Sequence, residues 1–326
     1  MAKPMTLAKK GVFLTFIALS LVAAMLVLIK PNNSVQDNNF PVVQNRIMQA
    51  NSFVTDVENV YLKNALESSG TKAVFALIEY MNDTDSFLTN FDRQFVDVMR
   101  NGTINGSYID TLTNAEIMKD NTLEHALSVL QNVSQDDFTT NSLLNITGLS
   151  AYQQDPWNLK VRANATLFVQ TESASWQRNM TVIALIPIQR FADPYPFVNS
   201  NAQIFNIINK SMVKSASWNV TSFEEHMALG TYIQNPAAPN FIMRFMNQSS
   251  SSQCCGIESI INPPLLSDND ETESYADYLF YSRAYENNCA QLYNMTEFYP
   301  DYSKLKLDYG HILLYNLTGA SFEDAC

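Results

Sequence analysis

The segment from Val12 to Ile29 constrains this chain more than any other feature, because it is almost wholly apolar and carries no charge. Eighteen helical residues cover about 27 Å at ~1.5 Å per residue, close to the hydrocarbon thickness of a bilayer. The sequence therefore predicts one transmembrane helix over residues 12–30. Three lysines precede the segment and every Asp and Glu follows it. The positive-inside rule then places a leader of residues 1–11 in the cytoplasm and the rest of the chain outside the cell, anchored by a single pass.

The exported part is strongly acidic. The whole chain has 20 Lys and Arg against 32 Asp and Glu, a net charge of −12. Four of the lysines lie at or before Lys30, so 16 basic residues remain against 32 acidic ones, a formal charge of −16. Such a surface repels nucleic acid and anionic lipid. We therefore expect no nucleic-acid partner.

Glycosylation signals are frequent in this exported part. Thirteen of the 34 asparagines begin an Asn-x-Ser/Thr sequon, and none of these has Pro in the middle. The sequons begin at Asn32, Asn82, Asn101, Asn105, Asn132, Asn145, Asn164, Asn179, Asn209, Asn219, Asn247, Asn294 and Asn316. We interpret them as acceptors for an N-glycosylation machinery that acts on exported chains. The alternative is that an Asn-rich chain collects unused sequons by chance.

The cysteines predict two disulfides near the C-terminus. Cys254, Cys255, Cys289 and Cys326 form an even set in an exported region, which is typical of disulfide bonding. Adjacent residues have Cα atoms about 3.8 Å apart, below the usual disulfide range, so we expect no Cys254–Cys255 bond. Each of these two then pairs with Cys289 or Cys326, in either connectivity. A metal site is disfavoured because no His lies near the cysteines and no Cys-x-x-Cys spacing occurs.

The first half of the exported part has helical periodicity. Residues 31–41 are polar and contain two prolines, which predicts a linker. After it, apolar residues recur every three or four positions. The predicted helices cover Val42–Gly70 with Gly70 as the cap, Thr71–Met81, a run capped by Asp83 or Asp85 that buries Phe91 and Phe95, and Thr113–Asn132. Asn101-Gly102 and Asn105-Gly106 predict turns. We therefore expect residues 42–150 to be mainly helical.

From Trp157 onward the periodicity changes to two, which predicts an antiparallel pair of strands over 158–170 and 175–190. Asn164 and Asn179 fall on the polar face of this pair, where a glycan points into water. Asp155-Pro156 and Asp193-Pro194 are interpreted as turns. Further predicted elements are a helix from Ser222 to Leu229 with a Ser222–Glu225 capping box, and strands over Tyr275–Tyr281 and His311–Tyr315. The predicted class is α+β, with a β-rich, disulfide-containing region over 151–326.

The start of the chain resembles a known export signal. Lys9-Lys10-Gly11 directly precedes the apolar segment that begins Val12-Phe-Leu-Thr-Phe16. This arrangement resembles the class III signal of archaeal type IV pilin-like proteins, which a prepilin peptidase cuts after the glycine. The resemblance implies cleavage between Gly11 and Val12, and packing of the apolar helix into a filament core. In that family the helix normally runs on into the head, where this chain has Pro31. The overall layout also resembles uncharacterised single-pass surface proteins of archaea.

No pattern identifies a catalytic site. Nucleophile-elbow and phosphate-loop signatures are absent. His125, His226 and His311 are too far apart in sequence to form a metal-binding pair, so we interpret each as structural. Asp268, Asp270, Glu271 and Glu273 offer oxygen ligands to calcium, but the EF-hand spacing is missing. We therefore expect a solvated loop and no cofactor, with calcium near Asp268 and Asp270 as the alternative.

The sequence leaves three functions open. The first is a pilin-like extracellular subunit, anchored by Val12–Ile29 and self-assembling into a filament with a glycosylated head outside. The second is a coat or adhesion protein whose helix stays in the membrane uncut. The third is an ectoenzyme, which only the size of the head supports. The expected partners are the membrane, copies of the chain itself, a prepilin-type peptidase and the glycosylation machinery.

Overall fold

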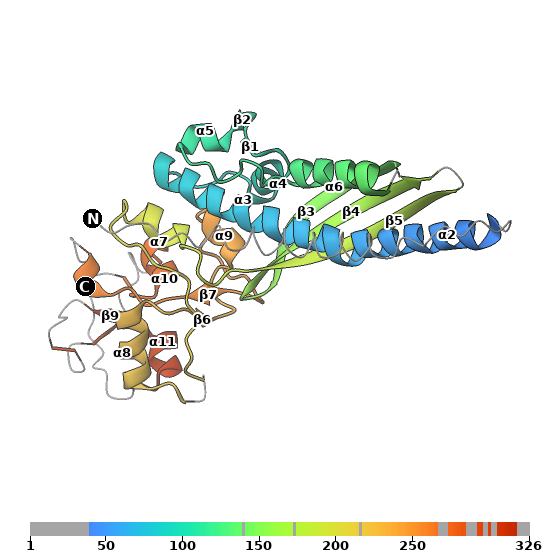
Figure 1. Ribbon diagram of the computed structural model, residues 1–326. Helices are drawn as coiled ribbons and strands as arrows, with labels where there is room; N and C mark the ends of the chain where they lie inside the picture. Colours follow the sequence, from blue (N-terminus) through green and yellow to red (C-terminus); the bar gives the residue numbers. More distant parts are fainter. Residues whose placement is uncertain are drawn as a thin grey trace, which may run out of the picture.

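Figure 1 shows the computed structural model of the chain, which describes residues 39–138, 141–171, 174–214, 217–266, 273–284, 292–295, 299–300 and 305–317. The leader, the predicted transmembrane segment and most of the predicted linker lie outside these ranges. Among the helices within them, none combines the length and the apolar character that crossing a bilayer requires. The described part contains helices and antiparallel sheets, so the predicted α+β class is confirmed.

A long helix begins the described part. It consists of α2 (Asn39–Asp56), a π-helical turn (Val57–Tyr61) and α3 (Leu62–Thr84), which follow one another without a break. The predicted end of this helix at Gly70 is wrong. A Cβ atom at Gly70 would lie 2.5 Å from the Cδ1 atom of Ile186 in the sheet, so the glycine permits close helix–sheet packing instead of capping the helix. The helix ends at Asp85, whose φ of 46° is left-handed.

The long helix lies against a three-stranded antiparallel sheet in the order β3-β4-β5. The strands are β3 (Asn141–Asp155), β4 (Asn158–Gln170) and β5 (Ser175–Pro187), so the predicted pair is confirmed, although β5 ends three residues early. Residues 141–150, which we placed in the mainly helical region without assigning them an element, belong to a strand. In β3 an exposed Leu143 and a register shift between Ile146 and Gly148 interrupt the period of two. Because of these irregularities, the residues of β3 do not alternate strictly between apolar and polar, and strict alternation is the pattern that predicts a strand.

One face of the sheet carries the helices. Alternate residues of β4 and β5, from Leu159 to Val169 and from Met180 to Ile186, are buried, and α3 packs on these two strands. α4 (Phe91–Asn101) and α6 (Leu123–Phe138) pack on β3 (Figure 1). The residues between them point to the opposite face and are exposed or half-buried. The sheet therefore has one face in the main hydrophobic core and one open face in the described part of the chain.

Small elements connect the helices on this layer. The hairpin of β1 (Thr103–Ile104) and β2 (Ser107–Tyr108) turns at Asn105 and Gly106, which both have positive φ, as the Asn-Gly pattern predicts. α5 (Ile109–Thr113) follows. The predicted helix from Thr113 to Asn132 starts late, at Leu123. The Asp110 carboxylate accepts hydrogen bonds from the backbone N–H groups of residues 117–119, and these bonds favour a loop there over a helix.

In the rest of the chain Phe241, Phe245 and Ile257 extend the main core, and a second, smaller core is built among short elements. They are α7 (Pro194–Asn199), α8 (Val220–Leu229), β6 (Ile233–Gln234), α9 (Phe241–Phe245), β7 (Ile257–Glu258), the 3-10 turn Pro263–Leu265, α10 (Asp277–Ser282), β8 (Leu292–Asn294), β9 (Lys306–Asp308) and α11 (Tyr309–Leu314). Buried aromatic residues such as Phe223, Tyr275 and Tyr315 fill this core. Strands of two or three residues are all that this region adds to the sheet content in the described ranges.

Two of the predicted strands in this region are wrong. The segment predicted as Tyr275–Tyr281 contains α10, and the segment predicted as His311–Tyr315 contains most of α11. Asp308 begins α11, because its carboxylate accepts a hydrogen bond from the His311 N–H group. The predicted helix through Leu229 is present, but the Asn219 side chain caps it by accepting from the Ser222 N–H group. Short apolar runs do not distinguish a strand from one helical turn.

Candidate functional site

The predicted glycosylation sites lie on the surface. Apart from Asn32, which is outside the described residues, twelve sequon asparagines are described; eleven are exposed and Asn294 is half-buried. The fourteen asparagines outside sequons whose burial is described divide evenly, seven exposed and seven half-buried. Sequon asparagines are thus more exposed than other asparagines of the same fold. This exposure is compatible with the predicted role of the sequons as glycan acceptors.

Three of these sequons meet on the open face of the sheet. Asn145-Ile-Thr147, Asn164-Ala-Thr166 and Asn179-Met-Thr181 occupy neighbouring strands β3, β4 and β5. The register places Asn164 opposite Thr181, and Thr166 between Asn145 and Asn179. The Thr181 hydroxyl donates to Asn164 Oδ1, and the Thr166 hydroxyl donates to Asn179 Oδ1, each at 2.9 Å. We call these three Asn and three Thr residues the sequon cluster. All of them except Asn145 line an open hollow of about 340 Å³.

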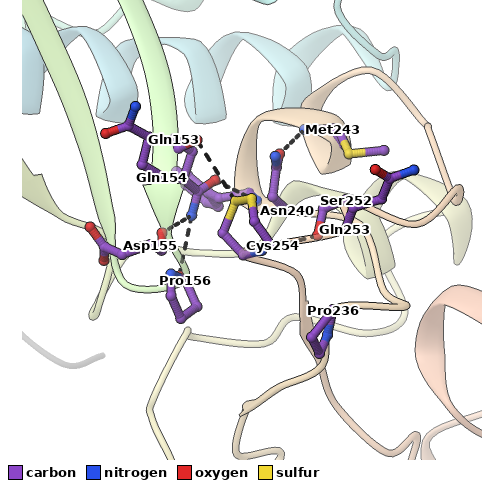
Figure 2. Close-up of a disulfide and its surroundings, with 12 residues drawn as sticks. Gln153, Gln154, Asp155, Pro156, Pro236, Asn240, Met243, Ser252, Gln253 and Cys254 are labelled. Atoms are coloured by element: carbon purple, nitrogen blue, oxygen red, sulfur yellow. Dashed lines mark hydrogen bonds between the residues drawn. A yellow bond between two sulfur atoms is a disulfide. The ribbon is translucent and has the colours of Figure 1, made fainter.

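The cysteines differ from their predicted pairing. Figure 2 shows a disulfide beside the end of β3, and it joins Cys254 to Cys255, the pairing that the sequence argument had excluded. The usual range of Cα separations applies to cysteines that are distant in sequence. Neighbouring sulfur atoms can also meet by closing a small ring across one peptide bond, and residues 253–255 form a bend here. Cys255 is buried, and its sulfur lies 3.7 Å from the Gln153 carbonyl oxygen. Cys289 and Cys326 lie outside the described residues.

Several other predicted site residues also lie outside the described ranges. They are Gly11 and Val12 of the predicted cleavage site, and Asp268 and Asp270 of the alternative calcium site. Glu273, at the edge of the predicted acidic loop, is buried, whereas we had expected it to be solvated. Among the described residues, no group of three or more His, Cys, Asp or Glu side chains is arranged to hold a metal ion.

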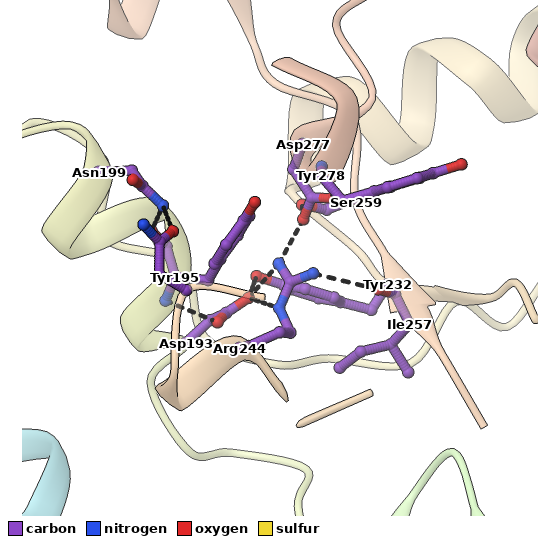
Figure 3. Close-up of polar contacts among 10 residues, drawn as sticks. Asp193, Tyr195, Asn199, Tyr232, Arg244, Ile257, Ser259, Asp277 and Tyr278 are labelled. Carbon is purple, nitrogen blue, oxygen red and sulfur yellow. Dashed lines mark hydrogen bonds and ion pairs between the residues drawn. The ribbon is translucent and has the colours of Figure 1, made fainter. Parts of the chain in front are cut away.

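The strongest electrostatic cluster is centred on Arg244 of α9, which is fully buried (Figure 3). Its Nε and Nη2 atoms donate to Asp193 Oδ2 at 2.8 and 2.6 Å, and Nη2 also pairs with Asp277. Its Nη1 atom donates to the Ile257 carbonyl at 3.1 Å. The guanidinium lies over the rings of Tyr195 and Tyr232, 4.9 and 5.6 Å from their centroids. One cation therefore joins α7, α9, α10 and β7.

The protonation states of this cluster follow from burial and pairing. Burial opposes the charge of Arg244, but Asp193 and Asp277 outweigh it and raise its pKa well above the ordinary value. Burial also raises the pKa of Asp277, and the pairing with Arg244 works against that rise. Tyr232 donates its hydroxyl to Asp193 at 2.7 Å, and burial raises its pKa far above 10. The charged and polar groups of the Arg244 cluster form their hydrogen bonds with one another and are buried away from water. This arrangement is typical of a structural network.

A second buried charge lies close by at His311. Its Nδ1 atom is 2.5 Å from Asp308 Oδ2, and its Nε2 atom is 3.2 Å from Glu258 Oε1. Burial alone lowers the pKa of His311, but the Glu258 and Asp308 carboxylates raise it well above its ordinary value. The imidazole is therefore held in its charged form between two carboxylates, and it ties α11 to β7.

His226 makes the contact that most resembles a catalytic pair. Its Nε2 atom is 2.6 Å from the Ser211 hydroxyl, and its Nδ1 atom is 2.9 Å from the Tyr315 hydroxyl. Burial lowers the pKa of His226, so the imidazole is neutral at pH 7. In a Ser–His–Asp site a carboxylate orients the imidazole, and here the Tyr315 hydroxyl takes that place. The contact holds α8 against the C-terminal end of α11.

Sequence reasoning missed Arg244 and the serine that faces His226. Arg244 is the one charge in the apolar run Phe241–Met246, and an isolated charge in such a run signals a buried ion pair. Ser211 begins a Ser-x-x-Lys spacing with Lys214, a signature that the sequence analysis overlooked. In the structure this segment is irregular and Lys214 is exposed, so the spacing does not build the helical nucleophile site that the signature denotes.

Known proteins add no identification to these observations. The chain was compared with protein-family models, with curated proteins and with solved structures, and none of the three comparisons finds a match.

Proposed function

We propose that the chain is an extracellular structural subunit of the pilin-like kind, anchored by Val12–Ile29 and exposing a glycosylated head. The observation that carries the proposal is the unbroken helix from Asn39 to Thr84, which begins a few residues after the apolar segment and packs along the sheet. In the resembled family a helix enters the head from the apolar segment. In this chain Pro31 stands in the sequence between the apolar segment and this helix.

Exposed apolar side chains near the start of the long helix support the proposal of self-assembly. In Figure 1 α2 projects beyond the strands, away from the short elements of the second core. Ile47 and Met48 on α2 are 43 and 58% exposed, and Val60 on the following turn is 54% exposed. From Ala50 onward the predicted apolar stripe is buried, at Val54 and Val57. Exposed apolar side chains on a projecting helix suit contacts with other copies of the same chain.

An extracellular location agrees with three independent features. The part after Lys30 carries a formal charge of −16, the chain contains a disulfide, and its sequon asparagines are exposed. Disulfides persist in oxidising compartments outside the cytosol. The described polar clusters are sealed and mutually paired, which favours an architectural role over catalysis.

The test is the mature N-terminus of the full chain, measured by mass spectrometry on protein from cells that make it, together with electron microscopy of their surface. We expect the chain to begin at Val12 and filaments to be present. Gly11→Val should block cleavage and abolish the filaments while the protein stays in the membrane fraction. Ala8→Val is the matched control, because it adds similar bulk to the leader without touching the cleaved bond.

The outcome also separates the proposal from its alternative. A mature chain that begins at Met1 or Ala2, in membranes without filaments, would contradict the pilin-like function. It would favour the permanently anchored coat or adhesion protein, whose helix remains in the bilayer. A chain found in the cytosol with bare asparagines would contradict both.

A further inference from the structure

We infer that the open face of the sheet is a carbohydrate face, on which Asn145, Asn164 and Asn179 carry N-linked oligosaccharides. The inference rests on the extracellular location proposed above and adds where the sugars gather. The three sequons lie on three adjacent strands and face the same side. Because the opposite side of these strands is packed against α3, α4 and α6, sugars on this side extend into solvent without displacing any described element.

The chemistry requires a donor from outside the chain. The donor is an oligosaccharide joined through its anomeric carbon to a lipid phosphate or pyrophosphate. The side-chain amide nitrogen of Asn attacks this carbon, a C–N bond forms, and the bond from carbon to the phosphate oxygen breaks. The lipid phosphate leaves with the electron pair, and the amide nitrogen loses one proton. Neither oxidant nor reductant is needed.

The hydrogen bonds of the sequon cluster leave the reacting atoms available in the folded chain. The Thr181 and Thr166 hydroxyls donate to the side-chain oxygens of Asn164 and Asn179. Each amide nitrogen, the atom that carries the sugar, is not used by these bonds. A glycosylated asparagine can therefore keep its Thr partner, so the native sheet accepts the modification without breaking either contact.

Gly148 keeps space open at the centre of the cluster. It follows the register shift in β3 and lies opposite Asn164. A Cβ atom at this position would lie 3.2 Å from the Asn164 amide nitrogen, closer than most Cβ contacts in proteins. The glycine therefore leaves room beside the nitrogen to which a sugar would be attached.

Sugars on the sequon cluster would also cover apolar side chains that the fold leaves in solvent. Leu143 and Phe168 form the neighbouring row on one side and are 55 and 41% exposed. Ile183 and Leu185 follow on the other side and are 45 and 44% exposed. Bulky hydrophilic glycans between these pairs would keep the open face out of protein contacts. Contacts between copies of the chain would then use other surfaces.

The first experiment is glycopeptide mass spectrometry on the full chain, purified from the surface of cells that make it. We expect sugar on all three asparagines of the sequon cluster, and on exposed Asn82 and Asn209 elsewhere. Sugar on Asn82 and Asn209 with fewer than two of the three cluster sites occupied would overturn the carbohydrate face and leave the extracellular location standing. Bare asparagines at every sequon would overturn the carbohydrate face and the glycosylated head, whereas the surface location of the purified protein would stand.

The second experiment measures the shielding with a fluorescent dye that binds exposed apolar surface. The variant carrying Asn145→Gln, Asn164→Gln and Asn179→Gln should bind at least twofold more dye than the glycosylated chain. Asn141→Gln is the matched control, because Asn141 is exposed at the start of β3 but begins no sequon. Asn145→Gln alone keeps both Asn–Thr hydrogen bonds and so tests shielding in an undisturbed sheet. Equal dye binding by Asn145→Gln and the control would overturn the shielding.

Discussion

At the scale of single residues, Arg244 determines whether the second core holds together. Arg244→Met would keep much of the buried volume but leave Asp193 and Asp277 without their cation. Removing one partner of a buried ion pair costs about 3–5 kcal/mol, because the remaining charge stays desolvated. We expect a loss of that size in the free energy of unfolding, measured by urea titration of the purified full chain with tryptophan fluorescence.

Arg93→Met is the matched control for this prediction. The Arg93 side chain is 82% exposed and approaches Asp97 only at 3.9 Å. Surface substitutions of this kind usually change stability by about 0.5 kcal/mol or less. If both variants lost the same small amount, the cluster around Arg244 would not be a buried network of charges.

His311 makes the stability of the head depend on pH. The Glu258 and Asp308 carboxylates overcome the effect of burial and raise its pKa in the folded chain, whereas the unfolded chain titrates at about 6.5. The charged imidazole therefore stabilises the fold fully below about pH 6.5, and this contribution is lost as the pH rises through the folded-state pKa. We expect the free energy of unfolding to fall from pH 6.5 towards pH 9, and His311→Gln to flatten that dependence.

Asp308 makes the free energy of unfolding depend on pH at the acidic end. Burial raises its pKa, but the hydrogen bond and charge of His311 lower it below the ordinary value. Its contribution is present above the unfolded pKa of about 3.9 and is lost as the pH falls through the folded value. His125→Gln is the control for His311→Gln, because the His125 side chain is 45% exposed. Identical pH profiles for the wild-type and His311→Gln chains would contradict this account.

At the scale of elements, the contact between α3 and β5 depends on Gly70. Gly70→Ala gains up to about 1 kcal/mol of helix propensity, but its Cβ atom meets the Ile186 Cδ1 atom at 2.5 Å. Ile186→Val removes that methyl group. We expect Gly70→Ala to be more favourable in the Ile186→Val background than in the wild type, by about 0.5 kcal/mol or more. Urea unfolding of the four chains of this double-mutant cycle measures the difference.

A control distinguishes the contact from a general helix effect. Ser68→Ala, at an exposed position of the same helix, also raises helix propensity but has no reason to depend on Ile186. Its effect should be the same in both backgrounds. A coupling between Ser68→Ala and Ile186→Val as large as that of Gly70→Ala would show that the cycle does not report the glycine contact.

The elements that the sequence predicted well are those with strict periodicity. β4 alternates over thirteen residues, and its bounds were predicted correctly. The turn at Asn105-Gly106 was predictable because only left-handed φ values close so tight a hairpin. β3 and α10 were not predicted, for two different reasons. A bulge interrupts the apolar alternation of β3, and α10 is too short to show a helical period. Gly70 was misread because a glycine that permits packing looks the same in sequence as one that caps a helix.

At the scale of the whole molecule, the sequence predicted surface features better than buried ones. Exposure of the sequons follows from their polar positions, and two of the three members of the sheet cluster lay on predicted strands. The buried networks could not be predicted, because Asp193, Arg244 and Asp277 lie 51 and 33 residues apart and meet only after folding. The adjacent disulfide was missed because a rule about distant cysteines was applied to neighbours.

The unbroken helix also determines how the head would bear mechanical load. A pull applied at Asn39 would travel along α2 and the π-helical turn into α3, which packs against β5. The 2.7 Å Glu58–Arg178 ion pair joins the π-helical turn to β5. The strands run beside the long helix, so the force would have to slide the helix layer over the sheet. Many side-chain contacts between the two layers would resist this sliding together. The second core, with its short helices and buried charges, joins this path where α7 packs against α3.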